Sequence, residues 1–283
     1  MNFKIKKFIK INPFIIPILC LSILSDYFKE FLTVLFLVTI HEIIHILVAY
    51  KFGCKLEKLY ITPLGQKAIL KNFNKIMPIK KFIVVLSGPL FNLILFLICD
   101  SIFYDSFEFF KKANLVIFLF NMFPIYPLDG GRLLQILLED IVGFIIINKF
   151  ILNLTKIISL ILILFGLIQN ILYPFNISLI LISMYIRFIS ISEYTNNTII
   201  FYKDLVTQEK KYCKYNILKI KNIIVGKDYI IKDIIEKTSW GTYLNVSFFY
   251  YNKLITFSEN EIINYFLNEN AYSKLEDIYL KKY

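Results

Sequence analysis

Long apolar stretches alternate with short polar segments along residues 1–192 of the chain. Each stretch approaches the ~20 residues that a helix needs to cross a membrane. Six of them occur, at residues 13–24, 31–50, 78–99, 113–128, 150–172 and 175–191. The pattern therefore predicts an α-helical polytopic membrane protein with about six transmembrane helices.

The pattern changes from about residue 193, where charged residues appear throughout and the apolar runs become shorter. Residues 243–251 and 253–257 have the pattern of a strand and its hairpin partner. Residues 258–268 have that of a helix, and Ser258 followed by Glu261 has the spacing of a capping box. We therefore predict a six-span membrane domain at residues 1–192 and a small cytoplasmic α/β domain at residues 193–283.

Composition and charge exclude two classes of protein. A hydrophobic content of 57% is too high for a soluble enzyme. The net charge of +11 is compatible with nucleic-acid binding, but the basic residues lie between the apolar runs and form no stripe with aromatic residues. Lysines are instead concentrated at the N-terminus and between residues 51 and 81. The positive-inside rule then predicts a multi-pass protein of the cell membrane with both termini in the cytoplasm.

The second apolar stretch contains the candidate chemistry, in the sequence His41-Glu42-Ile43-Ile44-His45. Residues four apart are neighbours on a helix, so both imidazoles can reach one metal ion. Glu42 can then take a proton from a metal-bound water without itself being a ligand. Packing between helices is the alternative, but a charged group at membrane depth costs roughly 2.5–3.5 kcal/mol. The chain's only two histidines occur at this spacing, which favours a metal site.

A catalytic zinc site needs three protein ligands and an open position. With no further histidine and no C-x-x-C spacing among the four cysteines, the third ligand is expected to be a carboxylate. Asp129 closes the fourth stretch, after two prolines that interrupt a regular helix and before Gly130 and Gly131. Irregular backbone at membrane depth is tolerated where it lines a cavity or is buried in protein. The alternative is an exposed aspartate in a turn at the end of a span.

These motifs, taken in order, resemble those of the site-2 proteases, which are zinc metalloproteases that cut within membranes. The resemblance includes the H-E-x-x-H sequence, a re-entrant loop at residues 61–65, the Ser-Gly-Pro-Leu-Phe-Asn sequence at residues 87–92 and residues 121–131. It implies that Zn²⁺ is bound by His41, His45 and Asp129, with Glu42 as general base. It also implies substrate-binding roles for four residues, namely Asn121, Pro127, Leu64 and Gly65.

The layout of six spans and one cytoplasmic domain is most similar to that of the sporulation members of this family. That resemblance implies a membrane-tethered substrate, a pro-sigma factor, cut near the cytoplasmic face. Inhibitory membrane proteins and a homo-oligomer are further partners to be considered, and nucleic acid is not. Residues 228–235 and 246–267 resemble one CBS-type module, which in such relatives binds adenine nucleotide. A regulatory or docking domain that binds no ATP is the alternative for this region.

A membrane scaffold or transporter with bound metal is the alternative to a protease. A structural zinc site is closed by four ligands, whereas this sequence offers three together with Glu42. Metal transport favours ionisable groups along several spans, and few occur at membrane depth outside the region of Glu42 and Asp129. The sequence therefore favours an intramembrane zinc metalloprotease.

Overall fold

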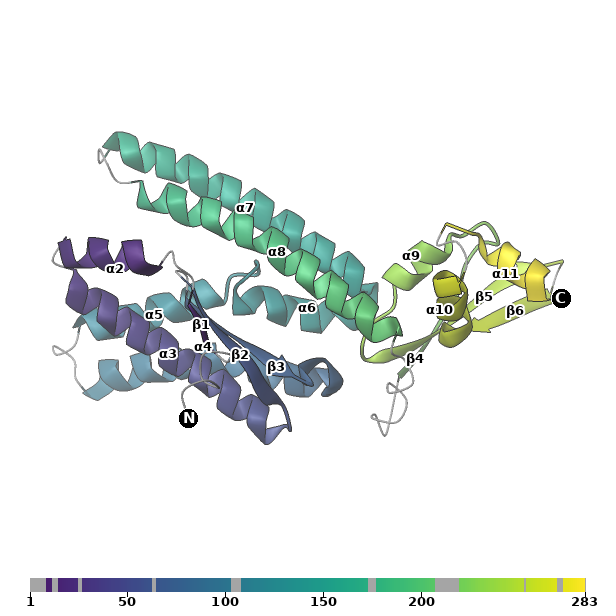
Figure 1. Cartoon of the computed structure of the whole chain (residues 1–283), viewed down its shortest axis with the longest axis horizontal. Coiled ribbons are helices and arrows are strands. Elements are labelled where there is room, and N and C mark those ends of the chain that lie inside the picture. The colour runs from purple at the N-terminus through teal and green to yellow at the C-terminus, as the bar shows by residue number, and fades with distance from the viewer. Residues whose placement is uncertain are drawn as a thin grey trace. The chain divides into compact units, whose positions relative to one another are not determined.

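The computed structural model describes residues 9–11, 15–24, 27–62, 65–102, 108–172, 177–206, 219–251, 253–268 and 272–282 (Figure 1). The chain divides into two compact units. The first comprises Met1–Pro124 and Leu128–Leu133, and the second comprises Ile125–Pro127 and Leu134–Tyr283. The residues around the predicted metal ligand Asp129 are thus the point at which the chain passes from one unit to the other.

Helices and one small sheet make up the first unit. Its helices are α2 (Ile15–Leu24), α3 (Phe28–Lys51), α4 (Pro78–Ile102), α5 (Glu108–Asn121) and the start of α6 (Asp129–Val142), with a short 3-10 turn η1 (Phe73–Lys75). Helix α3 ends at Lys51 and is followed by Gly53, whose φ of 83° is accessible to glycine without steric cost. The Gly53 N–H donates to the carbonyl of Tyr50 at 3.0 Å, which closes the last turn before the chain enters the sheet.

The sheet of the first unit contains β1 (Ile9–Ile11), β2 (Lys55–Thr62) and β3 (Gly65–Lys71) in the order β1-β2-β3. Strand β1 pairs with β2 in parallel, and β2 pairs with β3 in antiparallel fashion. Thr62 lies opposite Gly65, so most of the segment expected as a re-entrant loop belongs to a paired hairpin. Pro63 and Leu64 lie outside the described residues.

Three described helices are long and apolar enough to cross a membrane, namely Phe28–Lys51, Pro78–Ser101 and Phe144–Leu172. They correspond to three of the six predicted spans. The first predicted span contains α2, which has 10 residues, and the fourth overlaps α5, which has 14 and ends before Pro124. Both are shorter than the ~20 residues of a spanning helix. The sixth overlaps the first half of α8 (Ser178–Val206), whose C-terminal half is polar. Six spans are therefore not confirmed.

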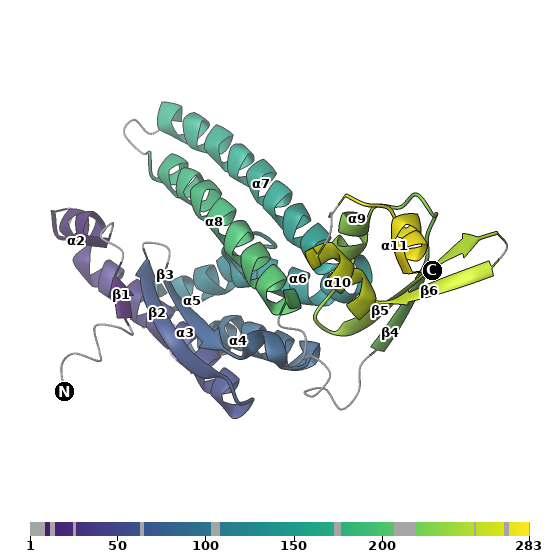
Figure 2. The same ribbon diagram turned by 45° about the vertical axis from the view of Figure 1, so that its right-hand side comes forward.

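Two long helices, α7 (Phe144–Leu172) and α8, lie side by side in the second unit (Figure 2). Small and polar residues line their contact, as is usual where helices pack without a hydrophobic driving force. A Cβ on Gly166 would lie 2.7 Å from Cγ1 of Ile180, so glycine allows the close approach of the helices. Nδ2 of Asn148 donates to Oγ1 of Thr198 at 2.9 Å. This bond joins α7 to the half of α8 that extends beyond residue 193.

The C-terminal part of the second unit has a core of its own. The sheet order is β4-β5-β6, formed by β4 (Lys219–Ile224), β5 (Thr242–Tyr250) and β6 (Lys253–Ser258), with helices α9 (Ile231–Glu236), α10 (Glu259–Asn268) and α11 (Leu275–Lys282). The predicted hairpin and following helix are confirmed. So is the capping box, because the Ser258 N–H donates to Oε2 of Glu261 at 2.9 Å and the Glu261 N–H donates to Oγ of Ser258 at 3.3 Å.

The ends of α7 and α8 belong to this same core. Phe144 at the start of α7 stacks on Phe201 of α8 with ring centroids 4.5 Å apart, and Trp240 meets both rings edge-on. Helix α8 therefore runs unbroken through residue 193, which divides the chain by composition and not by compactness. The division into a membrane domain at 1–192 and a cytoplasmic domain at 193–283 stays a prediction.

Candidate metal centre and active site

Helix α3 carries three of the predicted site residues in the first unit. His41, Glu42 and His45 are all buried, at 4%, 8% and 6% of their full exposure. The four-residue spacing of the histidines puts their rings next to each other, with centroids 4.8 Å apart. Ile43 and Leu47 on the other side of the helix are exposed, as expected of a face that contacts lipid. The polar face of α3 thus points into the protein.

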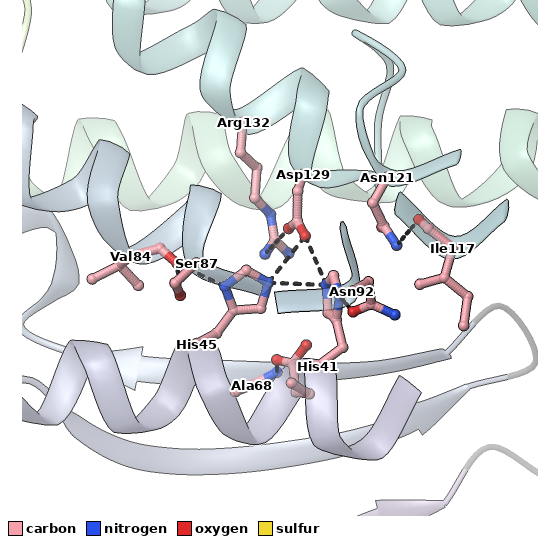
Figure 3. A network of polar contacts seen from close by, with 11 residues as sticks. His41, His45, Ala68, Val84, Ser87, Asn92, Ile117, Asn121, Asp129 and Arg132 are labelled. Carbon is pink, nitrogen blue, oxygen red and sulfur yellow. Dashed lines mark hydrogen bonds and ion pairs between the residues drawn. The ribbon is translucent and has the colours of Figure 1, made fainter. Parts of the chain in front are cut away.

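Asp129 meets the two histidines (Figure 3). Its Oδ2 lies 3.1 Å from Nε2 of His41 and 3.0 Å from Nε2 of His45, and the two nitrogens are 3.1 Å apart. Ligands about 2.0–2.1 Å from a tetrahedral Zn²⁺ lie roughly 3.3 Å from one another. The three atoms therefore have the spacing of three ligands of one zinc ion, and the cluster is buried.

Gly88 of α4 keeps the space beside these atoms free. A Cβ at this position would lie 2.3 Å from Nε2 of His45 and 2.7 Å from Nε2 of His41. Any side chain here would occupy the place next to both coordinating nitrogens. The donor set and this space together fit a metal ion with an accessible coordination position, as a catalytic zinc site requires.

The second nitrogen of each imidazole also has a partner. Nδ1 of His45 donates to the backbone carbonyl of Val84 at 2.7 Å, since a carbonyl can only accept. Nδ1 of His41 lies 2.9 Å from Oδ1 of Asn92. Such bonds orient metal-binding histidines and leave Nε2 available to the metal. Neither Val84 nor Asn92 was predicted as a site residue.

The irregular segment after α5 brings Asp129 into place. Residues 122–128 form turns and bends, as the two prolines predicted, and the Tyr126–Pro127 peptide bond is cis. A Cβ on Gly130 would lie 2.3 Å from the carbonyl oxygen of Phe123, so the loop can fold back onto α6 only at a glycine. Asp129 begins α6, and its Oδ1 forms an ion pair with Nη1 of Arg132 at 3.6 Å. Its two oxygens therefore face different partners.

Glu42 follows His41 directly on α3 but is not part of the cluster. Its Oε1 accepts a hydrogen bond from the Ala68 N–H of β3 at 2.5 Å. A second bond joins the same elements, from Nε2 of Gln66 to Oγ1 of Thr39. Strand β3 thus fixes the carboxylate predicted as the general base. Residues 55–62 alternate only over Lys55-Leu56-Glu57, and Lys58 is followed by three apolar residues, so their pattern gives no clear signal for a strand.

The structure describes three of the four remaining predicted residues. Asn121 donates to the carbonyl of Ile117 at 3.0 Å within α5, and it appears at the edge of the network in Figure 3. Gly65 is the first residue of β3. Pro127 is half-buried and belongs to the second unit together with Tyr126. Leu64 lies outside the described residues. Substrate binding by these four residues stays a prediction.

Comparison with known proteins gives one family match, to Peptidase family M50, over residues 30–106 and 98–165. A zinc metalloprotease of Methanocaldococcus jannaschii is 32% identical over 202 residues, which cover 66% of this chain and 57% of that protein. Stage IV sporulation protein FB of Bacillus subtilis is 32% identical over 143 residues, which cover 48% of this chain and 49% of that protein. This chain therefore spans about half the length of these two relatives.

A solved structure has the same fold over most of its length. The site-2 protease from Methanocaldococcus jannaschii matches with a TM-score of 0.55 and 29% identity, covering 66% of this chain and 90% of that one. The family match includes His41, His45 and Asp129, so the buried cluster lies inside the region of similarity.

Proposed function

Because the chain belongs to peptidase family M50, the family of the site-2 proteases, we propose that it is a zinc metalloprotease that cuts membrane-associated proteins. The observation that carries this proposal is the convergence of His41, His45 and Asp129, with Glu42 beside His41 on α3, a helix that has the length and composition of a membrane span. Inside the first unit, three ligands and a separate carboxylate are the parts that metal-assisted peptide hydrolysis requires.

His41, His45 and Asp129 would hold the zinc ion, which when bound polarises the substrate carbonyl and lowers the pKa of water. Glu42 takes the proton from the attacking water and passes it to the nitrogen of the departing amine. The Ala68 N–H holds Oε1 of Glu42, so that Oε2 is the oxygen left to accept this proton. The ion pair with Arg132 draws Oδ1 of Asp129 away from the histidines and leaves Oδ2 as the ligand atom.

The substrate must present an extended backbone, because a peptide bond inside a helix does not expose its carbonyl. Strand β3 lies at the edge of its sheet, and its Ala68 N–H points to Glu42 and not to β2. We propose that the substrate segment lies along this edge. Gly65, the first residue of β3, would contact it together with Leu64, Asn121 and Pro127.

A pro-sigma factor is the specific substrate we propose, with cleavage near the cytoplasmic face. The similarity to stage IV sporulation protein FB supports a role in sporulation. Inhibitory membrane proteins would then act on the same enzyme, and a homo-oligomer is the further assembly to test.

The decisive experiment co-expresses the protein with a membrane-tethered pro-sigma precursor, as wild type and as Glu42→Gln. We expect the variant to keep its zinc and to lose at least ~100-fold in cleavage, as expected when a general base is removed. A second precursor with an unrelated cytoplasmic domain tests the sporulation role. Cleavage by Glu42→Gln within tenfold of wild type would exclude the proposed mechanism and favour a metal-binding scaffold or transporter.

The proposed topology places both termini in the cytoplasm of a multi-pass protein. Single cysteines at Lys51, at the end of α3, and at Asp100, near the end of α4, test it once the four native cysteines are replaced. We expect an impermeant thiol reagent added outside intact cells to label position 100 and not position 51. Labelling of position 51 and not of position 100 would place the end of α3 on the outer side of the membrane. Cleavage would then be expected on that side.

The C-terminal sheet and its helices form, we propose, a CBS-like regulatory or docking domain. The order β4-α9-β5-β6-α10, with β4 parallel to β5, supports this proposal. If the domain binds ATP, millimolar ATP raises the melting temperature by mass action. The shift should be read from the fluorescence of Trp240, the only tryptophan of the chain, which packs in this core. If ATP does not raise the melting temperature, docking is the remaining proposal for this domain.

A further inference from the structure

Two buried asparagines on neighbouring helices connect the metal centre to the backbone of α5. Asn92 of α4 is 1% exposed and Asn114 of α5 is fully buried. A carboxamide in an apolar interior is costly unless its donors and acceptor are paired. Here Oδ1 of Asn92 lies 2.9 Å from Nδ1 of His41, and Nδ2 of Asn92 lies 3.2 Å from Oδ1 of Asn114. The two side chains thus form a chain of hydrogen bonds that ends at a metal ligand.

The direction of this chain follows from its far end. Nδ2 of Asn114 lies 2.9 Å from the backbone carbonyl of Phe110, which can only accept. Asn114 must therefore donate to Phe110 and turn its own oxygen toward Asn92. Asn92 must then donate to Asn114 and turn its oxygen toward His41. The His41 Nδ1 is left to donate, and the lone pair of its ring is on Nε2, which faces Asp129.

We infer that Asn92 and Asn114 are positioning residues that fix His41 as a zinc ligand. The inference rests on the proposed function, because it assumes that Nε2 of His41 binds the metal. Without Asn114, the amide of Asn92 can turn over and present its NH₂ group to Nδ1. His41 would then have to accept at Nδ1 and carry its proton on Nε2, where it blocks coordination.

The other histidine has no such dependence. His45 donates directly to the backbone carbonyl of Val84, whose direction cannot reverse. The two ligands therefore respond differently to side-chain changes on α5. Loss of Asn114 should affect His41 and leave His45 unchanged, although both belong to one metal site.

Zinc affinity is the first readout, measured by competition with a chelator on full-length protein purified without a histidine tag. We expect Asn92→Leu to weaken zinc binding about 10–100-fold, the usual loss when an outer-shell partner of a ligand is removed. Asn92→Asp restores an acceptor for Nδ1 of His41 and should recover most of the affinity. The matched control is Asn148→Leu, which removes a fully buried asparagine of α7 and should leave zinc affinity within about twofold of wild type.

The second readout is the NMR spectrum of the zinc-loaded protein labelled with ¹⁵N-histidine, which contains only two imidazoles. We expect two slowly exchanging Nδ1–H protons. In Asn114→Leu the proton of His41 should move upfield and exchange faster, while that of His45 stays unchanged. Zinc affinity of Asn92→Leu within twofold of wild type, or equal changes at both protons in Asn114→Leu, would overturn the inference. Neither readout depends on proteolysis, so a protein that binds zinc in this way but cleaves nothing would disprove the proposed function alone.

Discussion

The two sheets of this protein have the same pairing pattern but different surroundings. In each, a parallel pair is followed by an antiparallel pair along the chain. Strand β5 of the C-terminal sheet buries Leu244, Val246 and Phe248 completely or nearly so. In β2 and β3, by contrast, every side chain that the structure describes is half-buried or exposed. One sheet forms part of a hydrophobic core, whereas the other contributes its edge to the candidate active site.

The difference shows that strand pairing alone does not indicate what a sheet is for. The contribution of β5 is hydrophobic burial, which determines stability. That of β3 is one backbone N–H, which holds Glu42. Substitutions in the C-terminal sheet should therefore change unfolding and leave the chemistry intact, and substitutions in β3 should do the reverse.

The largest effect on stability is expected from Phe248→Ala. Truncating a buried phenylalanine costs about 3–5 kcal/mol of unfolding free energy, and Phe248 is fully buried in the C-terminal core. The fluorescence of Trp240 reports the unfolding of this region during denaturant titration. Phe249→Ala is the matched control, because this neighbour is 59% exposed and its loss should have little effect. Zinc content should be unchanged in both folded variants, and a loss of zinc in Phe248→Ala would contradict the comparison.

Ala68→Pro should lower activity with little effect on unfolding. Proline removes the N–H that Glu42 accepts, and it is tolerated on an edge strand where that N–H does not bond to the neighbouring strand. A hydrogen bond to a charged group contributes ~1.5–3 kcal/mol, so cleavage should fall roughly 10–100-fold. Ala68→Ser keeps the N–H and serves as control. Equal activities of the two variants would mean that β3 does not position the base.

The smallest change is expected from Ser258→Ala at the start of α10. It removes the hydroxyl half of the capping box, a loss of about 1 kcal/mol of stability. Glu261→Gln keeps an acceptor for the Ser258 N–H and should cost less. Both variants should cleave as wild type does, measured on the same tethered substrate. Reduced cleavage in Ser258→Ala would show that the C-terminal sheet has a role in catalysis.

The parts of the molecule that sequence predicted well are those set by local spacing. His41 and His45 meet because they are four positions apart on a helix, and Ser258 caps α10 because Glu261 follows three positions later. The prolines before Asp129 also predicted the irregular backbone at residues 122–128. In the structure, the carboxylate of Asp129 lies next to the histidines.

The parts that sequence missed depend on contacts between distant segments. Asn92 and Asn114 are 22 residues apart and meet only because α4 packs against α5. Strands β2 and β3 were not predicted, because lysines dominate their composition and the irregularity between Leu56 and Lys58 interrupts their alternation. Six spans are not confirmed, because apolar composition does not show where a helix ends, as α5 does at Asn121.

The central claim is that His41, His45 and Asp129 hold zinc with one position open for water and substrate. X-ray absorption spectroscopy of the purified, zinc-loaded protein tests it most directly. We predict two imidazole nitrogens and one or two oxygens at ~2.0–2.1 Å, with no sulfur, and the loss of an imidazole signal in His45→Ala. A spectrum with sulfur ligands, or one that His45→Ala leaves unchanged, would contradict the account.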